Sequence, residues 1–191
     1  MILYLVGVGC VGKTTIGRLL ANKLGCQFYD VDEEVERYYN KPIEKIQNES
    51  FSMNGYREKA SIVLDRIFTN NIDMVIAGTP SGLKYAYLSV SRKHKKNKNI
   101  NSIHVMDEPK NILSRIEFYD IDSNPITVIL DEKLGIKYMR AINSDYNFFK
   151  DSYKRADIQI DISNLALENI PLEIIKRLKL LNEVLASTLS S

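Results

Sequence analysis

The chain is poor in several residue types, and each shortage excludes a class of protein. Two of its 191 residues are cysteine, Cys10 and Cys26, and none is tryptophan. Two cysteines give no disulfide framework, and a bridge at Cys10 would obstruct the glycine-rich loop around it, so we expect reduced thiols and a cytoplasmic protein. The apolar run at residues 1–6 is far too short to span a membrane and carries no basic leader of a signal peptide. We therefore expect no membrane partner.

The chain also lacks a large excess of either charge. Its 26 lysine and arginine residues nearly balance 24 acidic residues, which leaves a formal net charge of +2. That is too little to favour nucleic acid as the main partner. The basic run at residues 92–98 contains no Phe, Tyr or Trp, so we interpret it as a solvated loop. His94 and His104 have no suitably spaced partner ligands, so the sequence predicts no histidine metal site.

What remains is an ordinary, balanced composition. Hydrophobic residues make up 45% of the chain and charged residues 26%, as is typical of a globular domain. A chain of this length buries one sizeable core, and neither a linker nor an internal repeat divides it. We therefore expect one domain over residues 1–191. The sequence holds no indication of an oligomeric state.

Strand and helix patterns alternate along the chain. Short apolar runs predict strands over 2–6, 27–29, 73–77, 102–106 and 156–162. Apolar residues at helical spacing predict helices over 13–24, 31–39, 53–69, 83–90, 108–118, 133–154 and 171–185, and Pro42 opens another. Residues 119–131 are rich in Asp, Ser, Asn and Pro, which favours an exposed, mobile segment. This alternation is typical of an α/β protein with a mostly parallel sheet.

A phosphate-binding motif follows the first predicted strand. Gly7, Gly12, Lys13 and Thr14 satisfy the pattern Gly-x-x-x-x-Gly-Lys-Thr between a strand and a helix. The glycines let backbone N–H groups approach phosphate oxygens, and the helix that follows points its positive end at the same anion. Lys13 supplies a charge for the β- and γ-phosphates, and Thr14 a hydroxyl for Mg²⁺. The residues expected to contact the nucleotide here are Gly7, Gly9, Cys10, Val11, Gly12, Lys13, Thr14 and Thr15.

Two acidic residues stand at the end of the second predicted strand. Because this strand runs beside the phosphate loop, Asp30 and Asp32 are well placed to contact a metal ion or the attacking hydroxyl of a substrate. The alternative is a helix cap with an acidic first turn, since Glu33 and Glu34 follow. The two interpretations are compatible, because capping a helix does not prevent a carboxylate from taking part in chemistry.

These motifs resemble the first part of the shikimate kinase family. The matching stretches are Gly12-Lys13-Thr14-Thr15-Ile16-Gly17-Arg18-Leu19-Leu20-Ala21, Leu24-Gly25, Phe28-Tyr29-Asp30-Val31-Asp32 and Gly55-Tyr56-Arg57. The resemblance is good over residues 1–60 and patchy beyond. It implies a P-loop kinase fold, an α/β three-layer sandwich whose five-stranded parallel sheet has the order 2-3-1-4-5 and helices on both faces. It also implies ATP and Mg²⁺ as cofactors and a small-molecule acceptor.

The resemblance assigns roles at the reacting centre. Lys13 and Asp32 would be the catalytic residues, with Asp32 binding the acceptor hydroxyl and directing its proton. Thr14 and Asp30 would serve the metal ion, Asp30 by way of water. Phosphoryl transfer depends mainly on positioning and charge, so these residue types suit the reaction.

The resemblance also assigns roles in substrate binding. Residues 31–60 would form the substrate-binding helices, and Arg57 would pair with a substrate carboxylate, whose two oxygens a guanidinium can bind at once. A solvated helix face is the alternative for Arg57. Gly78 and Thr79 would lie against the substrate, and Arg115 would reach the nucleotide.

The chain departs from the family pattern where the acceptor and the lid are expected. One glycine of the family's triplet survives in Gly78-Thr79-Pro80, and Ala60 replaces an acidic residue. In the predicted lid, roughly residues 114–131, Asn124-Pro125-Ile126 stands in place of Arg-Pro-Leu, so an arginine that would stabilise the transferring phosphoryl group is missing. The stretch 119–123 is acidic and repels ATP unless a cation intervenes.

The family's second carboxylate-binding arginine has no clear counterpart either. The region where it is expected has the sequence Phe148-Phe149-Lys150-Asp151-Ser152-Tyr153-Lys154-Arg155, and Arg140 lies farther upstream on the same predicted helix. Lys154 or Arg155 would supply charge near the substrate if either replaces it. The alternative is that both are solvated cations at a helix end.

Taken together, the motifs predict an ATP-dependent small-molecule kinase with a hydroxyl acceptor. By resemblance the acceptor is shikimate, or else a related polar metabolite. One alternative is a nucleotide-binding regulatory protein that has lost kinase activity, for which the missing lid arginine argues. Another is a nucleoside or nucleotide kinase, which the absence of base-recognising arginines in the lid disfavours.

Overall fold

Five parallel strands form the central sheet of the computed structural model, which describes the backbone of residues 1–189 and the side chains of residues 1–183 and Ala186. In chain order they are β1 (Ile2–Val6), β2 (Gln27–Asp30), β3 (Met74–Ala77), β4 (Ile100–Met106) and β7 (Ile158–Asp161). Across the sheet the order is β2-β3-β1-β4-β7, and every neighbouring pair is parallel. This confirms the predicted order 2-3-1-4-5, because β7 is the fifth strand of the sheet.

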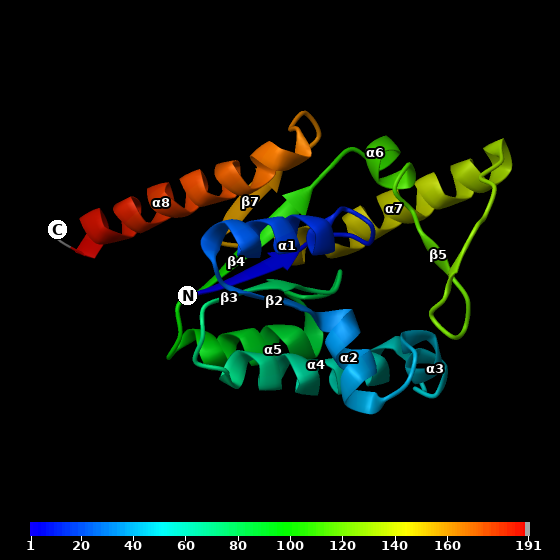
Figure 1. Cartoon of the computed structure of the whole chain (residues 1–191), viewed down its shortest axis with the longest axis horizontal. Helices are drawn as coiled ribbons and strands as arrows, with labels where there is room; N and C mark the ends of the chain where they lie inside the picture. Colours follow the sequence, from blue (N-terminus) through cyan, green and yellow to red (C-terminus); the bar gives the residue numbers. More distant parts are fainter. Residues whose placement is uncertain (190–191) are drawn as a thin grey trace.

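Helices cover both faces of this sheet, as predicted. They are α1 (Lys13–Leu24), α2 (Val31–Tyr39), α3 (Ile43–Asn48), α4 (Met53–Thr69), α5 (Tyr85–Lys95), α6 (Pro109–Leu113), α7 (Glu132–Tyr153) and α8 (Ile170–Leu189). Figure 1 shows α4 and α5 packed together below the sheet, while α8 lies on the other side and contacts α1. None of the helices in residues 1–189 is both long and apolar enough to cross a membrane.

The core lies between sheet and helices because the central strands are apolar along their whole length. Every residue of β1 and of β3 is buried, as expected for strands covered on both faces. On α1 the buried face includes Ile16, Gly17 and Leu20. A Cβ at Gly17 would lie 2.5 Å from the ring of Phe28 on β2. The glycine therefore allows the close packing that brings the start of α1 beside the end of β2.

Two predictions of secondary structure are wrong in part. The basic run 92–98 was expected to be a loop, but α5 extends through residue 95 because Lys93 and His94 both contact Asp65 of α4, at 2.8 and 2.7 Å. The helix expected over 108–118 is shorter, since α6 ends at Leu113 and the chain then enters a strand.

The segment 119–131, expected to be exposed and mobile, contains part of a small hairpin. Its strands are β5 (Phe118–Tyr119) and β6 (Pro125–Ile126), which pair antiparallel. Ser123 in the turn donates from Oγ to Glu36 Oε1 of α2 at 2.6 Å, and Asp122 forms an ion pair with Lys45 of α3. Figure 1 shows the hairpin beside α3, on the side toward which the strands of the sheet point. These contacts dock the hairpin against the helices that follow β2.

Candidate active site

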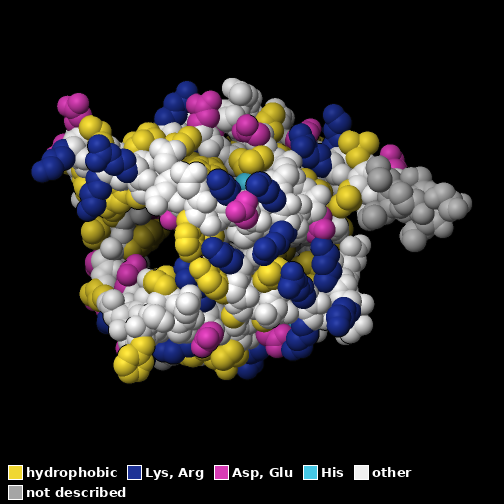
Figure 2. All heavy atoms as spheres, turned by 180° about the vertical axis from the view of Figure 1, so that it is seen from behind, with side chains coloured by type: hydrophobic (Ala, Val, Ile, Leu, Met, Phe, Trp, Pro, Cys, Tyr) yellow, Lys and Arg dark blue, Asp and Glu magenta, His cyan; other side chains and the backbone are white. Residues whose placement is uncertain are grey.

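A cleft of about 860 Å³ opens at the carboxyl end of the sheet. Its walls come from the loop between β1 and α1, from the end of β2 with α2 and α3, and from residues 114–123. Seen from behind, the molecule is hollowed on the side of the hairpin (Figure 2). Open α/β sheets bind their ligands at this edge. The cleft is therefore the candidate active site.

The loop between β1 and α1 needs its glycines. Gly7 has φ +154°, and a Cβ there would lie 2.5 Å from the carbonyl oxygen of Val105. Gly12 has φ +103°, a conformation that favours glycine. Cys10 lies exposed between them, and its thiol is free, as is that of Cys26. No side chain caps the start of α1. The first N–H groups of this helix are therefore available to bind an anion.

Lys13 is the buried cation of this loop. Its Nζ donates to the carbonyl oxygens of Gly7 and Val8, at 3.0 and 2.9 Å, and 9% of the residue is exposed. Burial lowers the pKa of Lys13, while the carboxylates of Asp32 and Asp30 oppose that shift. The ammonium group is thus held by backbone oxygens at the point where the loop would meet phosphate.

Asp30 links the phosphate loop to the strand beside it. Its Oδ2 accepts a hydrogen bond from Thr14 Oγ1 at 2.7 Å, and its Oδ1 accepts from the backbone N of Asp32 at 2.9 Å. The second bond caps α2. The capping interpretation of Asp30 is therefore confirmed, while the first bond places the same carboxylate against the hydroxyl of the phosphate loop.

Asp32 lies across the cleft from the loop, in the first turn of α2. Its side chain is exposed to the cleft, and Tyr56 OH donates to Oδ1 at 3.4 Å. Protein atoms crowd the carboxyl group, and the resulting loss of hydration raises its pKa to about 6. Asp30 adds to this rise and Lys13 opposes it. A carboxyl group with such a pKa is ionised at neutral pH and can still accept a proton.

Acidic side chains dominate the walls of the cleft. Those among the described residues are Asp30, Asp32, Glu33, Glu36, Glu44 and Glu117. The cations of the described chain that line it are Lys13 and Arg115. A polyanionic ligand would therefore need accompanying cations to enter at low electrostatic cost.

Arg115 is fixed at the rim of the cleft by a buried carboxylate. It forms an ion pair with Asp107, whose side chain is 1% exposed. The other oxygen of Asp107 accepts from Glu108 N at 2.7 Å and from Asn111 Nδ2 at 2.8 Å. The guanidinium is thus positioned by the end of β4 and by α6, and it faces the same cleft as the phosphate loop.

Arg57, which the family resemblance assigned to the substrate, does not line this cleft. Its Nη1 donates to Asn54 Oδ1 at 2.9 Å, and its Cζ lies 4.8 Å from the centre of the Tyr85 ring. Its Nε is buried and has no hydrogen-bond partner in the described part of the chain. A buried donor without a partner is costly, so Arg57 differs from an ordinary solvated arginine on a helix face.

Gly78 and Thr79 also lie outside the residues that line the cleft, and both are buried. A Cβ at Gly78 would lie 2.5 Å from the ring of Tyr4 and 2.9 Å from the carbonyl oxygen of Leu5. Packing against β1 therefore accounts for this glycine without any ligand.

Two tyrosines close to Asp32 were not predicted as site residues. Tyr56 donates to Asp32, and Tyr87 on α5 is fully buried. Burial raises the pKa of Tyr87, while a hydrogen bond with Thr79 lowers it; the charge of Asp32 raises it further and that of Arg57 opposes the shift. Tyr56 could have been predicted as a site residue, because it belongs to the stretch Gly55-Tyr56-Arg57 that resembles the family. Nothing in the sequence around Tyr87 indicated a place near the site.

The hairpin, where the sequence predicts a lid, and the end of α7 keep the departures from the family pattern that were seen in the sequence. Asn124, where an arginine is expected, donates from its backbone N to Asp120 Oδ1 at 2.9 Å. Lys154 pairs with Asp151 at 2.9 Å on the surface, and Arg155 is exposed. Neither of these two cations lines the cleft.

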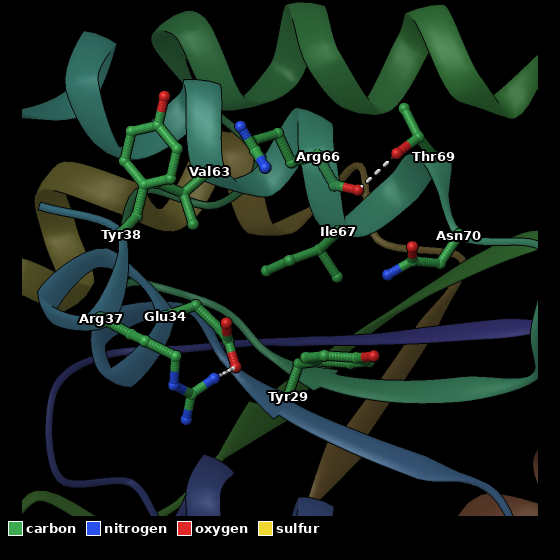
Figure 3. A pocket seen from close by; sticks show the side chains of 9 residues that line it. All are labelled: Tyr29, Glu34, Arg37, Tyr38, Val63, Arg66, Ile67, Thr69 and Asn70. Carbon is green, nitrogen blue, oxygen red and sulfur yellow. Dashed lines mark hydrogen bonds and ion pairs between the residues drawn. The ribbon is translucent and has the colours of Figure 1, made fainter.

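A second cavity, of about 530 Å³, lies beside β2 between α2 and α4 (Figure 3). There Arg37 forms an ion pair with Glu34, and Arg66 lies 4.9 Å from the centre of the Tyr38 ring. The described residues that line it include none from the phosphate loop. The larger cleft therefore remains the candidate active site.

Comparison with known proteins identifies relatives along most of the chain. A family model described as shikimate kinase matches residues 9–179. Shikimate kinase of Persephonella marina is 28% identical over 178 residues, which cover 93% of this chain and 98% of that protein. Shikimate kinase of Chlorobium phaeobacteroides is 42% identical over 66 residues, which cover 35% of this chain and 33% of that protein. This last match spans a third of the relative's length.

A solved structure supports the fold. Shikimate kinase from Acinetobacter baumannii, in complex with shikimate, matches this chain with a TM-score of 0.72 and 22% identity, covering 93% of this chain and 92% of that one. It agrees with the sheet order and helix layers described above. Because the family model extends over most of the chain and includes Gly12, Lys13 and Thr14 of the phosphate loop, this chain is a P-loop kinase that belongs to the shikimate kinase family.

Proposed function

We propose that the chain transfers the γ-phosphoryl group of ATP to a hydroxyl group of shikimate or of a related polar metabolite. The observation that carries this is the meeting of three features in one cleft: the buried Lys13 of the phosphate loop, the Thr14–Asp30 pair, and Asp32 opposite them. Membership in the family supports a phosphotransferase with a hydroxyl acceptor. The relative solved with shikimate supports this acceptor.

The nucleotide would be held by the phosphate loop and by Arg115. Lys13 Nζ would exchange the carbonyl oxygens of Gly7 and Val8 for the β- and γ-phosphates, which are better partners because they carry charge. The N–H groups at the start of α1 would bind the same phosphates. Arg115 is positioned by Asp107 at the rim and would contact the nucleotide from the other side.

A magnesium ion fits the oxygen atoms at the foot of this loop. Thr14 and Asp30 offer a hydroxyl and a carboxylate, the hard donors that Mg²⁺ prefers, and the described residues hold no group of three or more His, Cys, Asp and Glu that could bind a metal. A site with few protein ligands suits Mg²⁺, which usually shares its shell with phosphates and water. The ion would neutralise phosphate charge in this acidic cleft.

Asp32 would orient the acceptor hydroxyl and take its proton. Its pKa of about 6 leaves it ionised at neutral pH, close enough to neutrality for general base catalysis. Tyr56, which donates to Oδ1 at 3.4 Å, would leave Oδ2 for the acceptor. Arg57 would bind an acidic group of the acceptor, which would also satisfy its unpartnered Nε.

The proposal extends to the domain as a whole, to the lid and to the floor of the acceptor site. We propose one kinase domain over residues 1–191 in which residues 31–60 hold the acceptor. Residues 114–131 would act as the lid, closing over the cleft with the hairpin that now rests on Glu36 and Lys45. Gly78 and Thr79 would form the floor beneath the acceptor, next to β1.

A coupled assay of ADP release with ATP, Mg²⁺ and shikimate tests this function, with Lys13→Ala as the blank. We expect turnover above the blank and its loss in Asp32→Ala. Calorimetry with ATP separates binding from chemistry. If ATP binds but neither shikimate nor a panel of hydroxy acids stimulates ADP release, the kinase proposal fails.

Two observations favour a second candidate, a nucleotide-binding regulatory protein without kinase activity. The cleft carries six acidic residues against two cations in the described chain, and the lid holds Asn124 in place of an arginine. Such a protein would bind ATP and Mg²⁺ and leave every acceptor unphosphorylated. The same assay and calorimetry distinguish the two candidates.

A further inference from the structure

Three aromatic rings surround the ammonium group of Lys84, the residue that precedes α5. Its Nζ lies 3.8 Å from the centre of the Phe148 ring, 5.1 Å from that of Tyr85 and 5.8 Å from that of Phe149. Cation–π contacts of this kind hold a lysine in place. In the described part of the chain, Nζ has no carboxylate partner. Its positive charge is therefore positioned but not neutralised.

The Tyr85 ring carries a second cation. Arg57 Cζ lies 4.8 Å from its centre, so both charges are about 5 Å from one ring. Among the described residues Arg57 has no carboxylate partner either, and its buried Nε has no hydrogen-bond partner. Two neighbouring cations with an unsatisfied donor favour the binding of an anion, because an anion would reduce their repulsion and accept the missing hydrogen bond.

The backbone of Tyr85 has an unusual conformation. It has φ +52° at the first residue of α5, whereas Lys84 before it is extended, with φ −135° and ψ 162°. Bulky residues seldom adopt the left-handed region, and those that do cluster at ligand sites. The change in backbone direction lets Lys84 reach the rings of α7 while Tyr85 contacts Arg57.

The aromatic pair on α7 stands in the stretch where the family pattern expects its second carboxylate-binding arginine. Phe148 and Phe149 begin that stretch here, and Lys84 reaches it from α5. Tyr153, farther along α7, donates to the carbonyl oxygen of Pro80 at 2.9 Å. This bond ties the end of α7 to the segment that leads into α5. Lys84, which precedes α5, thus places a positive charge beside the part of α7 where the family pattern expects an arginine.

The geometry points to Lys84 as the second cation of the acceptor-binding site: Lys84 and Arg57, which share the Tyr85 ring, bind one carboxylate of the acceptor. This inference rests on the proposed kinase function and restricts it to acceptors that carry an acidic group. The pair lies near the reacting centre, since Tyr56, which directly precedes Arg57, donates to Asp32 Oδ1 at 3.4 Å. Lys84 takes no part in the chemical step and acts through binding.

The test compares Lys84→Met with Lys84→Arg, using shikimate and its carboxamide analogue as acceptors. Lys96→Met is the matched control, because Lys96 is an exposed lysine at the opposite end of α5. We expect Lys84→Met to raise KM for shikimate by about tenfold or more, the loss typical of a charge-assisted hydrogen bond, while kcat stays within about threefold. KM for ATP and for the carboxamide should not change, and Lys84→Arg should restore most of the affinity.

Unchanged KM for shikimate, or an equal rise with the uncharged carboxamide, overturns the inference. Absence of turnover in the wild-type protein means that the proposed function has failed, and calorimetric titration with shikimate then decides the inference separately. Weaker binding in Lys84→Met than in Lys96→Met supports it. Equal heats in both variants, including no binding by the wild type, reject it.

Discussion

The two sides of the proposed active site, a phosphate-loop wall that lines the cleft and an acceptor wall whose residues lie outside that lining, are built in different ways. On the phosphate-loop side, Gly7, Gly12 and Lys13 are fixed by backbone dihedrals and by hydrogen bonds to backbone oxygens. On the proposed acceptor side, Arg57 and Lys84 both contact the Tyr85 ring and lack carboxylate partners in the described chain.

This difference agrees with the ligand that we propose for each wall. Phosphate is the same in every nucleotide, so backbone groups next to a buried strand can bind it, and they tolerate few substitutions. An acceptor is bound by side chains on helices and loops, and these can be exchanged as long as the charge is kept in place. The chain matches its family on the first wall and departs from it on the second.

The largest effect should come from the phosphate-loop wall, with Lys13→Met. Removing the only buried cation among the described loop residues should lower kcat by at least about a thousandfold, because charge on the transferring group is no longer neutralised. ADP release measured with saturating ATP checks this. Lys23→Met, at the exposed end of the same helix, is the control. Comparable loss in both variants would mean that the helix, and not the ammonium group, is responsible.

Asp32→Asn should have the next largest effect, a fall in kcat of about a hundredfold or more, since the amide cannot accept the acceptor's proton. In the wild type the pH profile of kcat/KM should fall below about pH 6, where Asp32 becomes protonated. The profile is measured by ADP release between pH 5 and 8. A profile that stays flat through pH 6 would exclude Asp32 as the base.

The same carboxyl group should make stability depend on pH. Its folded pKa of about 6 lies above the unfolded value of about 3.9, so protonated Asp32 favours the folded state. This contribution is complete below about pH 4 and is lost as pH rises through about 6. Thermal unfolding should therefore show Asp32→Asn to be more stable than the wild type at pH 7, with the difference shrinking toward pH 4. A less stable variant at pH 7 would contradict the raised pKa.

Asn124→Arg should change activity less, and upward. Restoring a lid cation would add transition-state charge stabilisation and raise kcat by up to about tenfold, provided that the hairpin closes on the nucleotide. Asn124→Gln, which lengthens the side chain without charge, is the control for loss of the contacts with Asp120. If the arginine variant is no faster than the glutamine variant, this lid does not approach the transferring phosphoryl group.

The smallest effect should come from Ser123→Ala. Losing the 2.6 Å hydrogen bond to Glu36 would free the hairpin from α2 and change KM for the acceptor by about threefold, with kcat nearly constant. Steady-state kinetics measure this, and Ser163→Ala, on an exposed turn far along the chain, is the control. A large loss of kcat would instead assign Ser123 to the chemical step.

Much of the fold could be predicted because its signals are local. Apolar runs gave the five strands, and the glycines of the phosphate loop gave the turn into α1. Boundaries failed where distant contacts decide them: α5 is prolonged by the pairing of Lys93 and His94 with Asp65 on another helix. The hairpin after α6 is likewise held by residues more than seventy positions away, such as Glu36 and Lys45.

The sequence by itself determined the phosphate-loop wall, since spacing along one turn of chain dictates where Gly7, Gly12, Lys13 and Thr14 lie. The arrangement of the proposed acceptor wall was determined only by the tertiary structure. Whether the missing arginine on α7 has a replacement depends on the meeting of Lys84 with Phe148, and no spacing in the sequence connects α5 with α7. Only the packed structure brings such residues together, because side-chain contacts between elements depend on how helices pack on the sheet.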